Sequence, residues 1–168
     1  ALETFHASSD GDGQNTAVGT NALQALTNGQ RNTVMGAFAA DTITQGTDNI
    51  AIGAAALGAA TTTDGISFNV AIGSYALDGF TTETVDSAIA IGYAAMSGAI
   101  EDSGAGSIAI GRAALGAMTS SAKQVAIGYR AGEPLTTGGE NTIIGYAAMD
   151  ECHVDTDGCT AIGVDSMS

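Results

Sequence analysis

The chain has 168 residues, with 18 Asp and Glu against 4 Lys and Arg, and its formal net charge is −14. Nucleic acids and anionic membrane surfaces are therefore not expected as partners, because both are recognised by clustered Lys and Arg. No apolar run is long enough for a membrane-spanning helix, so membrane insertion is not expected either. The 24 glycines, the single proline and the lack of tryptophan favour closely packed backbones, as in stacked β-coils, over a globular core of large side chains.

Residues 1–14 contain no copy of the repeat that fills the rest of the chain. We expect them to form a leading segment or N-terminal cap, and residues 15–168 to form one repeat domain. The chain begins without Met, and we expect it to be a piece of a longer protein or a processed product.

The repeat is clearest at residues 69–73, Asn-Val-Ala-Ile-Gly, which Ala76 and Leu77 follow. It occurs nine times, and the glycines that end its copies are 17 to 20 residues apart. These glycines are Gly19, Gly36, Gly53, Gly73, Gly92, Gly111, Gly128, Gly145 and Gly163. A nearly fixed period of this length predicts a solenoid in which each copy forms one coil. We therefore expect an all-β fold, a parallel β-solenoid of about nine coils.

Alignment on the glycine separates corner, strand and core positions. The position four residues before the glycine holds asparagine in five copies, at Asn15, Asn32, Asn49, Asn69 and Asn141. Asparagine tolerates turn geometry and bonds its own backbone, so this column predicts the corner before a strand. β-branched residues follow, and we expect a four-residue strand that ends at the glycine. The apolar residues three, four and seven positions after the glycine are expected to point inward.

The strand is apolar on both of its faces. In residues 70–73, Val70 and Ile72 share one face while Ala71 and Gly73 share the other, because successive side chains alternate. A thin coil covers only one face of such a strand. The other face is expected to meet another chain, and for a fibre we expect threefold symmetry.

The pattern Asn-x-Ala-Ile-Gly-x-x-Ala resembles the head repeats of trimeric autotransporter adhesins and the Asn-Thr-Ala-Ile-Gly-Tyr-x-Ala-Leu arrays of bacteriophage tail fibres. The resemblance covers residues 15–167. It implies a left-handed parallel β-roll, a homotrimer with three chains side by side, and a structural or adhesive fibre. Such a fibre binds a host cell-surface receptor or glycan, from a virion tail appendage or from the bacterial cell surface. The Ala-Leu element and the long coils favour the tail fibre, with the adhesin head as the alternative.

One column provides a candidate binding site. The position directly after the glycine reads Tyr93, Arg112, Tyr129 and Tyr146 in four consecutive copies. Neighbouring coils are about 4.8 Å apart, so these side chains are expected to form a ladder. If exposed, the ladder could lie against a sugar ring or a partner surface. The alternative is that it stabilises the solenoid or packs in the trimer interface.

Two other columns of the repeat predict ion pairs between coils and a ladder of threonines. Five positions before the glycine, Arg31 precedes Asp48 and Lys123 precedes Glu140 by one coil, which predicts two ion pairs without a functional role. Eight positions after the glycine, threonine recurs, and a threonine ladder is typical of some ice-binding proteins. The residues are Thr27, Thr44, Thr61, Thr81, Thr119 and Thr136. Because the next outward column is mixed, ice binding is a minor alternative.

Chemistry at single sites has little support. Cys152 and Cys159 lie in one copy, and a disulfide and two free thiols are both open. Asp10-Gly-Asp12 and Asp155-Thr-Asp157 share the spacing that opens a calcium loop but lack its later ligands, so we expect turns and no metal or cofactor. No nucleophile elbow or phosphate loop is present, and we do not expect an enzyme.

Overall fold

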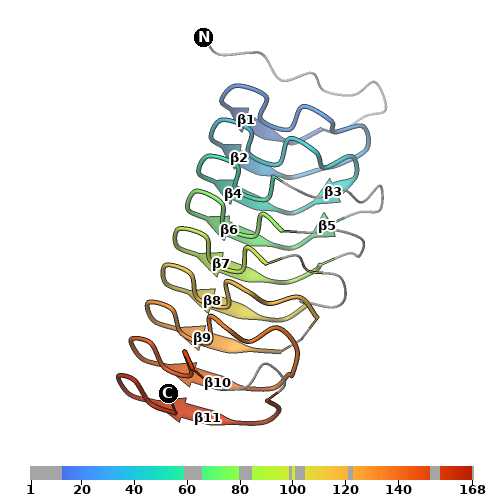
Figure 1. The fold of residues 1–168 in the computed structure, drawn as a ribbon. Helices are drawn as coiled ribbons and strands as arrows, with labels where there is room; N and C mark the ends of the chain where they lie inside the picture. The colour runs from blue at the N-terminus through green and yellow to red at the C-terminus, as the bar shows by residue number, and fades with distance from the viewer. Residues whose placement is uncertain are drawn as a thin grey trace.

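The structure is a computed structural model that describes residues 13–58, 66–79, 85–98, 100, 105–120, 123–151 and 156–167. These residues form β-strands and turns stacked into one elongated body (Figure 1). They contain no helix, and so none long and apolar enough to cross a membrane. All but two residues of the expected leading segment, 1–14, lie outside the described ranges.

Each copy of the motif contributes one strand to a nine-stranded parallel sheet. The strands are β1 (Thr16–Val18), β2 (Thr33–Met35), β4 (Ile50–Ile52), β6 (Val70–Ile72), β7 (Ile89–Ile91), β8 (Ile108–Ile110), β9 (Val125–Ile127), β10 (Thr142–Ile144) and β11 (Thr160–Ile162). They follow one another in chain order, and equal motif positions are paired, for example Ala71 with Ala90. The predicted all-β parallel solenoid is therefore confirmed. The left hand and the trimer stay predictions.

A second pairing lies on the opposite side of the coils from the turns that follow the main strands (Figure 1). β3 (Gly46–Thr47) pairs in parallel with β5 (Ile66–Ser67). Both strands lie just before a corner asparagine, so the chain enters the corner already in extended conformation. This second sheet was not predicted by the repeat pattern.

The corner before each main strand is built differently from our expectation. The left-handed residue is not the asparagine but the residue before it, as in Arg31, Asp48, Lys123 and Glu140, whose φ values are 56–62°. The asparagine turns its side chain inward, where Asn49 is 1% exposed. Its amide bonds the neighbouring coil rather than its own backbone, because a buried amide needs a partner for each of its polar atoms.

The glycine ends each main strand after three residues, one fewer than expected. The nine motif glycines have φ of 126–148°, which L side chains rarely adopt. A Cβ on Gly111 would lie 2.2 Å from the carbonyl oxygen of Gly128, in the next coil. The glycine column thus lets one turn pass directly over the next.

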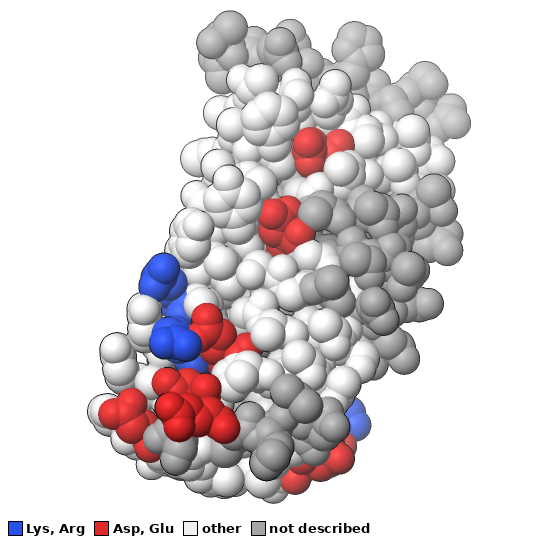
Figure 2. All heavy atoms as spheres, in the orientation of Figure 1, with Lys and Arg blue, Asp and Glu red and all other residues white. Residues whose placement is uncertain are grey.

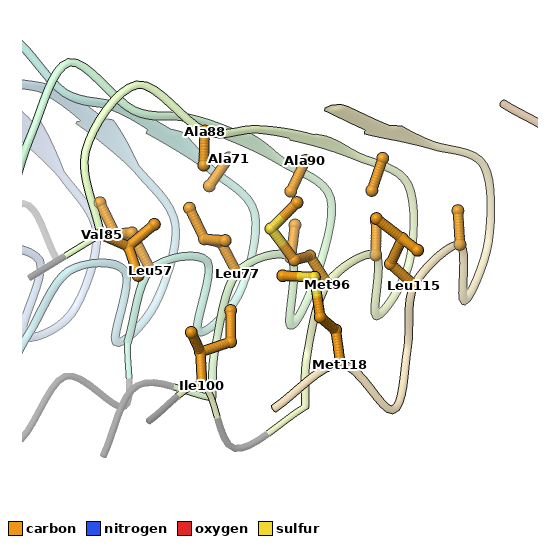
Figure 3. Packing of buried hydrophobic residues seen from close by; sticks show 14 of the residues in the cluster. Leu57, Ala71, Leu77, Val85, Ala88, Ala90, Met96, Ile100, Leu115 and Met118 are labelled. Carbon is orange, nitrogen blue, oxygen red and sulfur yellow. The ribbon is translucent and has the colours of Figure 1, made fainter. Parts of the chain in front are cut away.

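The core is a narrow column between the main sheet and the turns that follow it. Alanines such as Ala71 and Ala90 point inward from the sheet, and larger side chains such as Leu77 and Met96 meet them from the turns (Figure 3). All four are 0% exposed. The inward positions predicted three, four and seven residues after the glycine are confirmed for most of the described copies. Ala60, Phe80, Ala99 and Cys152, which share the last of these columns, lie outside the described residues.

Candidate binding surfaces

The main sheet turns its larger aliphatic side chains outward. In β6, Ala71 is buried while Val70 and Ile72 are partly exposed, and the same pattern recurs from strand to strand. We call the outward side chains of the nine strands the outer face. It consists of Thr16, Val18, Thr33, Met35, Ile50, Ile52, Val70, Ile72, Ile89, Ile91, Ile108, Ile110, Val125, Ile127, Thr142, Ile144, Thr160 and Ile162. None of these residues is charged, and exposure reaches 51% at Met35 and 65% at Ile162.

Buried amides run along one corner of the solenoid. Asn15, Asn32, Asn49 and Asn69 form a continuous ladder in which each Oδ1 accepts the backbone N–H of the next coil at 2.9–3.1 Å. Each side-chain amide also donates one hydrogen bond to a backbone carbonyl oxygen, as from Asn49 to Ile66 at 2.6 Å. Asn141 continues the column further along with Gln124. These predicted repeat residues therefore hold adjacent coils together, and all of them are buried except Asn15, which is partly exposed.

The four residues predicted to form a ladder, Tyr93, Arg112, Tyr129 and Tyr146, do lie in contact with one another, and a fifth residue from another column joins them. The rings of Tyr129 and Tyr146 are stacked, with centroids 5.1 Å apart and planes 10° from parallel. The guanidinium of Arg112 lies 5.7 Å from the ring centroid of Tyr93 and 5.4 Å from that of Tyr129. Tyr75 extends the series, because its ring meets that of Tyr93 edge-on at 5.9 Å. We call these five residues the tyrosine–arginine ridge.

The ring orientation decides what the ridge can bind. Tyr129 and Tyr146 turn their faces toward each other, and the guanidinium of Arg112 lies over the rings on either side of it. A sugar ring therefore cannot stack between adjacent rungs. The surface instead presents ring edges, phenol hydroxyls and the edge of the guanidinium. Tyr93 is 52% exposed and Tyr146 55%, so the ridge is open to solvent in the single chain.

The two ion pairs predicted between coils are confirmed. Nε of Arg31 lies 2.7 Å from Asp48, and Nζ of Lys123 lies 3.1 Å from Glu140. The bond between Arg31 and Asp48 raises the pKa of the guanidinium and lowers the pKa of the carboxyl group. A third pair, Arg130 with Glu133, closes within one turn and raises the pKa of Arg130. Column alignment could not reveal that pair, since both of its members lie in one coil.

The basic side chains are few, and three of the four are paired with acids. On the face drawn in Figure 2 they are confined to the lower half, at its two edges, with acidic side chains next to them. Burial raises the pKa of Asp41, the opposite direction to that of Asp48. Within the described ranges, no group of three His, Cys, Asp or Glu side chains could hold a metal ion.

The remaining candidate residues give partial results. The hydroxyl groups of Thr27 and Thr119 donate to the carbonyl oxygens of Thr44 and Thr136 in the next coil, at 2.9 and 3.0 Å. These hydroxyls thus join coils, while Thr61 and Thr81 lie outside the described residues. Cys159 is half-buried, and its N–H donates to Asn141 at 2.7 Å. Cys159 is a free cysteine in the structure, and Cys152 and Asp155 lie outside the described residues.

The chain was compared with models of protein families, with curated protein sequences and with solved structures, and none of them matched.

Proposed function

We propose that this chain is a structural and adhesive fibre segment that self-associates as a homotrimer through its outer face. Its role is to form a rigid shaft in a phage tail fibre or similar appendage and to support binding to a host cell-surface receptor or glycan. The observation that carries the proposal is the outer face itself, which is uncharged along all nine strands.

Parallel sheets are normally covered on both faces. Here the inner face packs against the core, whereas in a single chain the outer face keeps Ile50, Ile127 and Ile144 at 36–38% exposure. An exposed apolar surface of this extent is typical of an interaction site. A second copy offers a surface of the same length and repeat, so identical chains can bury their outer faces against each other in register.

The backbone favours a stiff shaft. Nine strands at a spacing of about 4.8 Å extend some 40 Å along the solenoid axis. Every coil is bonded to the next through the sheet, and the first four asparagines of the corner column add a second line of bonds. Bending such a body would break several hydrogen bonds at once.

The test is the oligomeric state of the purified chain by native mass spectrometry and light scattering. We expect three times the 16.5 kDa of one chain. Replacing Ile72 and Ile91 by Lys places charges on the outer face and should yield monomers. The matched control is Phe38→Lys, since Phe38 is 48% exposed but lies outside the outer face. A wild-type chain that stays monomeric at high concentration would refute the proposal.

The same outer face would serve the head of a bacterial trimeric surface adhesin. Gene sequence on either side of this segment separates the two roles, because a tail-attachment domain indicates the fibre and an outer-membrane anchor indicates the adhesin. Ice binding is tested by thermal hysteresis of the purified chain.

A further inference from the structure

Arg112 differs from the other cations of this acidic chain. The chain has 4 Lys and Arg, and all of them are described. Arg31, Lys123 and Arg130 each lie against a carboxylate. Arg112 has no carboxylate partner among the described residues, although acids outnumber bases 18 to 4 in the sequence. Its contacts are instead with Tyr93 and Tyr129.

These contacts fix the guanidinium without using most of its donors. Tyr93 and Tyr129 hold its carbon 5.7 and 5.4 Å from their ring centroids. Nη1 donates to the hydroxyl oxygen of Tyr129 at 2.9 Å, the only hydrogen bond the side chain makes to another described residue. A guanidinium has five N–H donors in a rigid planar fork. Arg112 is exposed, so its free donors can receive a planar anion from solvent.

We propose that the tyrosine–arginine ridge binds a carbohydrate that carries a carboxylate, with the carboxylate on the fork of Arg112. The neighbouring phenol groups of Tyr93, Tyr129 and Tyr146 bond hydroxyl groups of the sugars on either side. The site rests on the proposed function, for which it names the class of receptor. Because Tyr93 and Tyr129 already hold the guanidinium in place, little conformational entropy is lost on binding.

The spacing of the ridge favours a carbohydrate over a peptide. Rungs of the ridge repeat at about 4.8 Å along the axis, the distance between coils. An extended peptide presents side chains to one face every two residues, or about 6.7 Å, and drifts out of step with the rungs. A sugar ring with its glycosidic oxygen spans about one rung. A polysaccharide lying along the axis can therefore meet successive rungs with successive sugars.

The charge of the chain limits the ligand to few carboxylates. One unpaired cation faces the ligand, while the net charge of −14 repels a polyanion. We therefore expect the preferred ligand to have one carboxylate among neutral sugars. For the same reason, binding should weaken only modestly with added salt.

The test uses sialyllactose, which has one carboxylate, trigalacturonate, which has three, the carboxyl-reduced form of each, and the peptide Gly-Glu-Gly. Binding to the full chain is measured by calorimetry and by the NMR resonance of the Arg112 Nε–H. We expect an acidic sugar to shift that resonance and to bind about tenfold or more tightly than its reduced form, since a charge-assisted pair is lost on reduction. A resonance that no acidic sugar shifts, or equal binding of the reduced sugar or the peptide, would overturn the site.

Variants separate this site from simple charge attraction. Arg112→Gln and Arg112→Lys should both lose most of the affinity, since Lys keeps the charge but not the planar fork. Arg130→Gln is the matched control, because Arg130 is paired with Glu133 and should leave affinity within about twofold. Equal loss in Arg130→Gln, or full affinity in Arg112→Lys, contradicts the proposal.

The oligomeric state of each variant is measured beside its affinity. An intact trimer without sugar binding would overturn this site alone and leave the proposed fibre standing. If Arg112→Gln instead dissociates the oligomer, the ridge is an interface between chains and the sugar site is refuted.

Discussion

Oδ1 of Asn32 accepts two hydrogen bonds from Asn49, one from the backbone N–H and one from the side-chain amide, both at 3.0 Å. Asn49 in turn offers its own Oδ1 to Asn69 at 3.1 and 3.2 Å. Asn49 thus donates two hydrogen bonds to the asparagine of one neighbouring coil and accepts two from the asparagine of the other. Because these amides are buried, their bonds are made away from competing water, and a missing amide leaves partners unsatisfied.

Asn49→Ala should destabilise the solenoid by about 2–4 kcal/mol, because buried polar groups would lose their partners. The affected groups include the N–H of Asn69 and the carbonyl of Ile66. Urea unfolding followed by circular dichroism measures the change. Asn28→Ala makes the same chemical change at an exposed position and should stay within about 0.5 kcal/mol of wild type. Similar losses in both variants would show that the ladder adds no stability.

Ala88→Asn tests the ladder from the opposite direction. Ala88 occupies the asparagine column, and its N–H donates to Oδ1 of Asn69 at 2.9 Å. An asparagine there can donate to the same oxygen and accept the N–H of Ser107, which would extend the ladder by one coil. We expect a gain of about 0.5–1.5 kcal/mol. The urea midpoint of the variant measures this gain. A clear loss of stability would mean that the corner at Ala88 has no room for the amide.

The fold could be predicted from the sequence because a solenoid places equal columns on top of one another. Equal positions in the repeat predict the pairing of Ala71 with Ala90 and the bond from Arg31 to Asp48, and the structure contains both. The direction in which a side chain points within its coil could not be predicted from the column. The same column of asparagines is compatible with side chains that bond their own backbone and with side chains that bond the next coil. Only the packed structure distinguishes these two arrangements.

The order of the residues along the tyrosine–arginine ridge was predicted, but the orientation of their rings was not. The column gave Tyr93, Arg112, Tyr129 and Tyr146 as successive rungs, while the ring planes depend on side-chain torsions that spacing does not set. Tyr75 was missed because it lies one position further after its glycine, and the turn brings it to the same ridge. The short pairing of β3 with β5 was missed because it lies beside the segments whose lengths vary between copies.

Two aspartates should respond to pH with opposite signs. The pKa of Asp48 is lowered by Arg31, so its ionised form stabilises the fold above the ordinary Asp pKa, and that contribution is lost as pH falls below about 4. The pKa of Asp41 is raised by burial, so its contribution is present in acid and is lost as pH rises through the raised pKa. Asp48→Asn should therefore destabilise at pH 7, and Asp41→Asn should stabilise.

Both differences from wild type should be smaller at pH 3 than at pH 7, because the unfolded chain takes up protons below the ordinary Asp pKa and ionised carboxylates then contribute less to the stability difference. Urea midpoints of the three chains at pH 7 and pH 3 measure this. Added salt at pH 7 should reduce the effect of Asp48→Asn, because the pair with Arg31 is exposed. Effects of one sign, or effects that persist unchanged in acid, would contradict the assigned causes.

Gly111→Ala should be among the most damaging single substitutions in the described chain. Gly111 has φ of 136°, and a Cβ there would lie 2.2 Å from the carbonyl oxygen of Gly128, a backbone atom fixed by its own coil. Strain and overpacking together should cost about 3–5 kcal/mol. Gly106→Asn is the control, since Gly106 is also left-handed but has nothing within 4 Å of an added Cβ. Its column holds Lys123 and Glu140 in other coils, so the loss should stay below about 1 kcal/mol. Thermal and urea unfolding measure the stability of the two variants. Equal losses of stability would mean that the motif glycine is needed only for its backbone conformation and not for the close passage of coils.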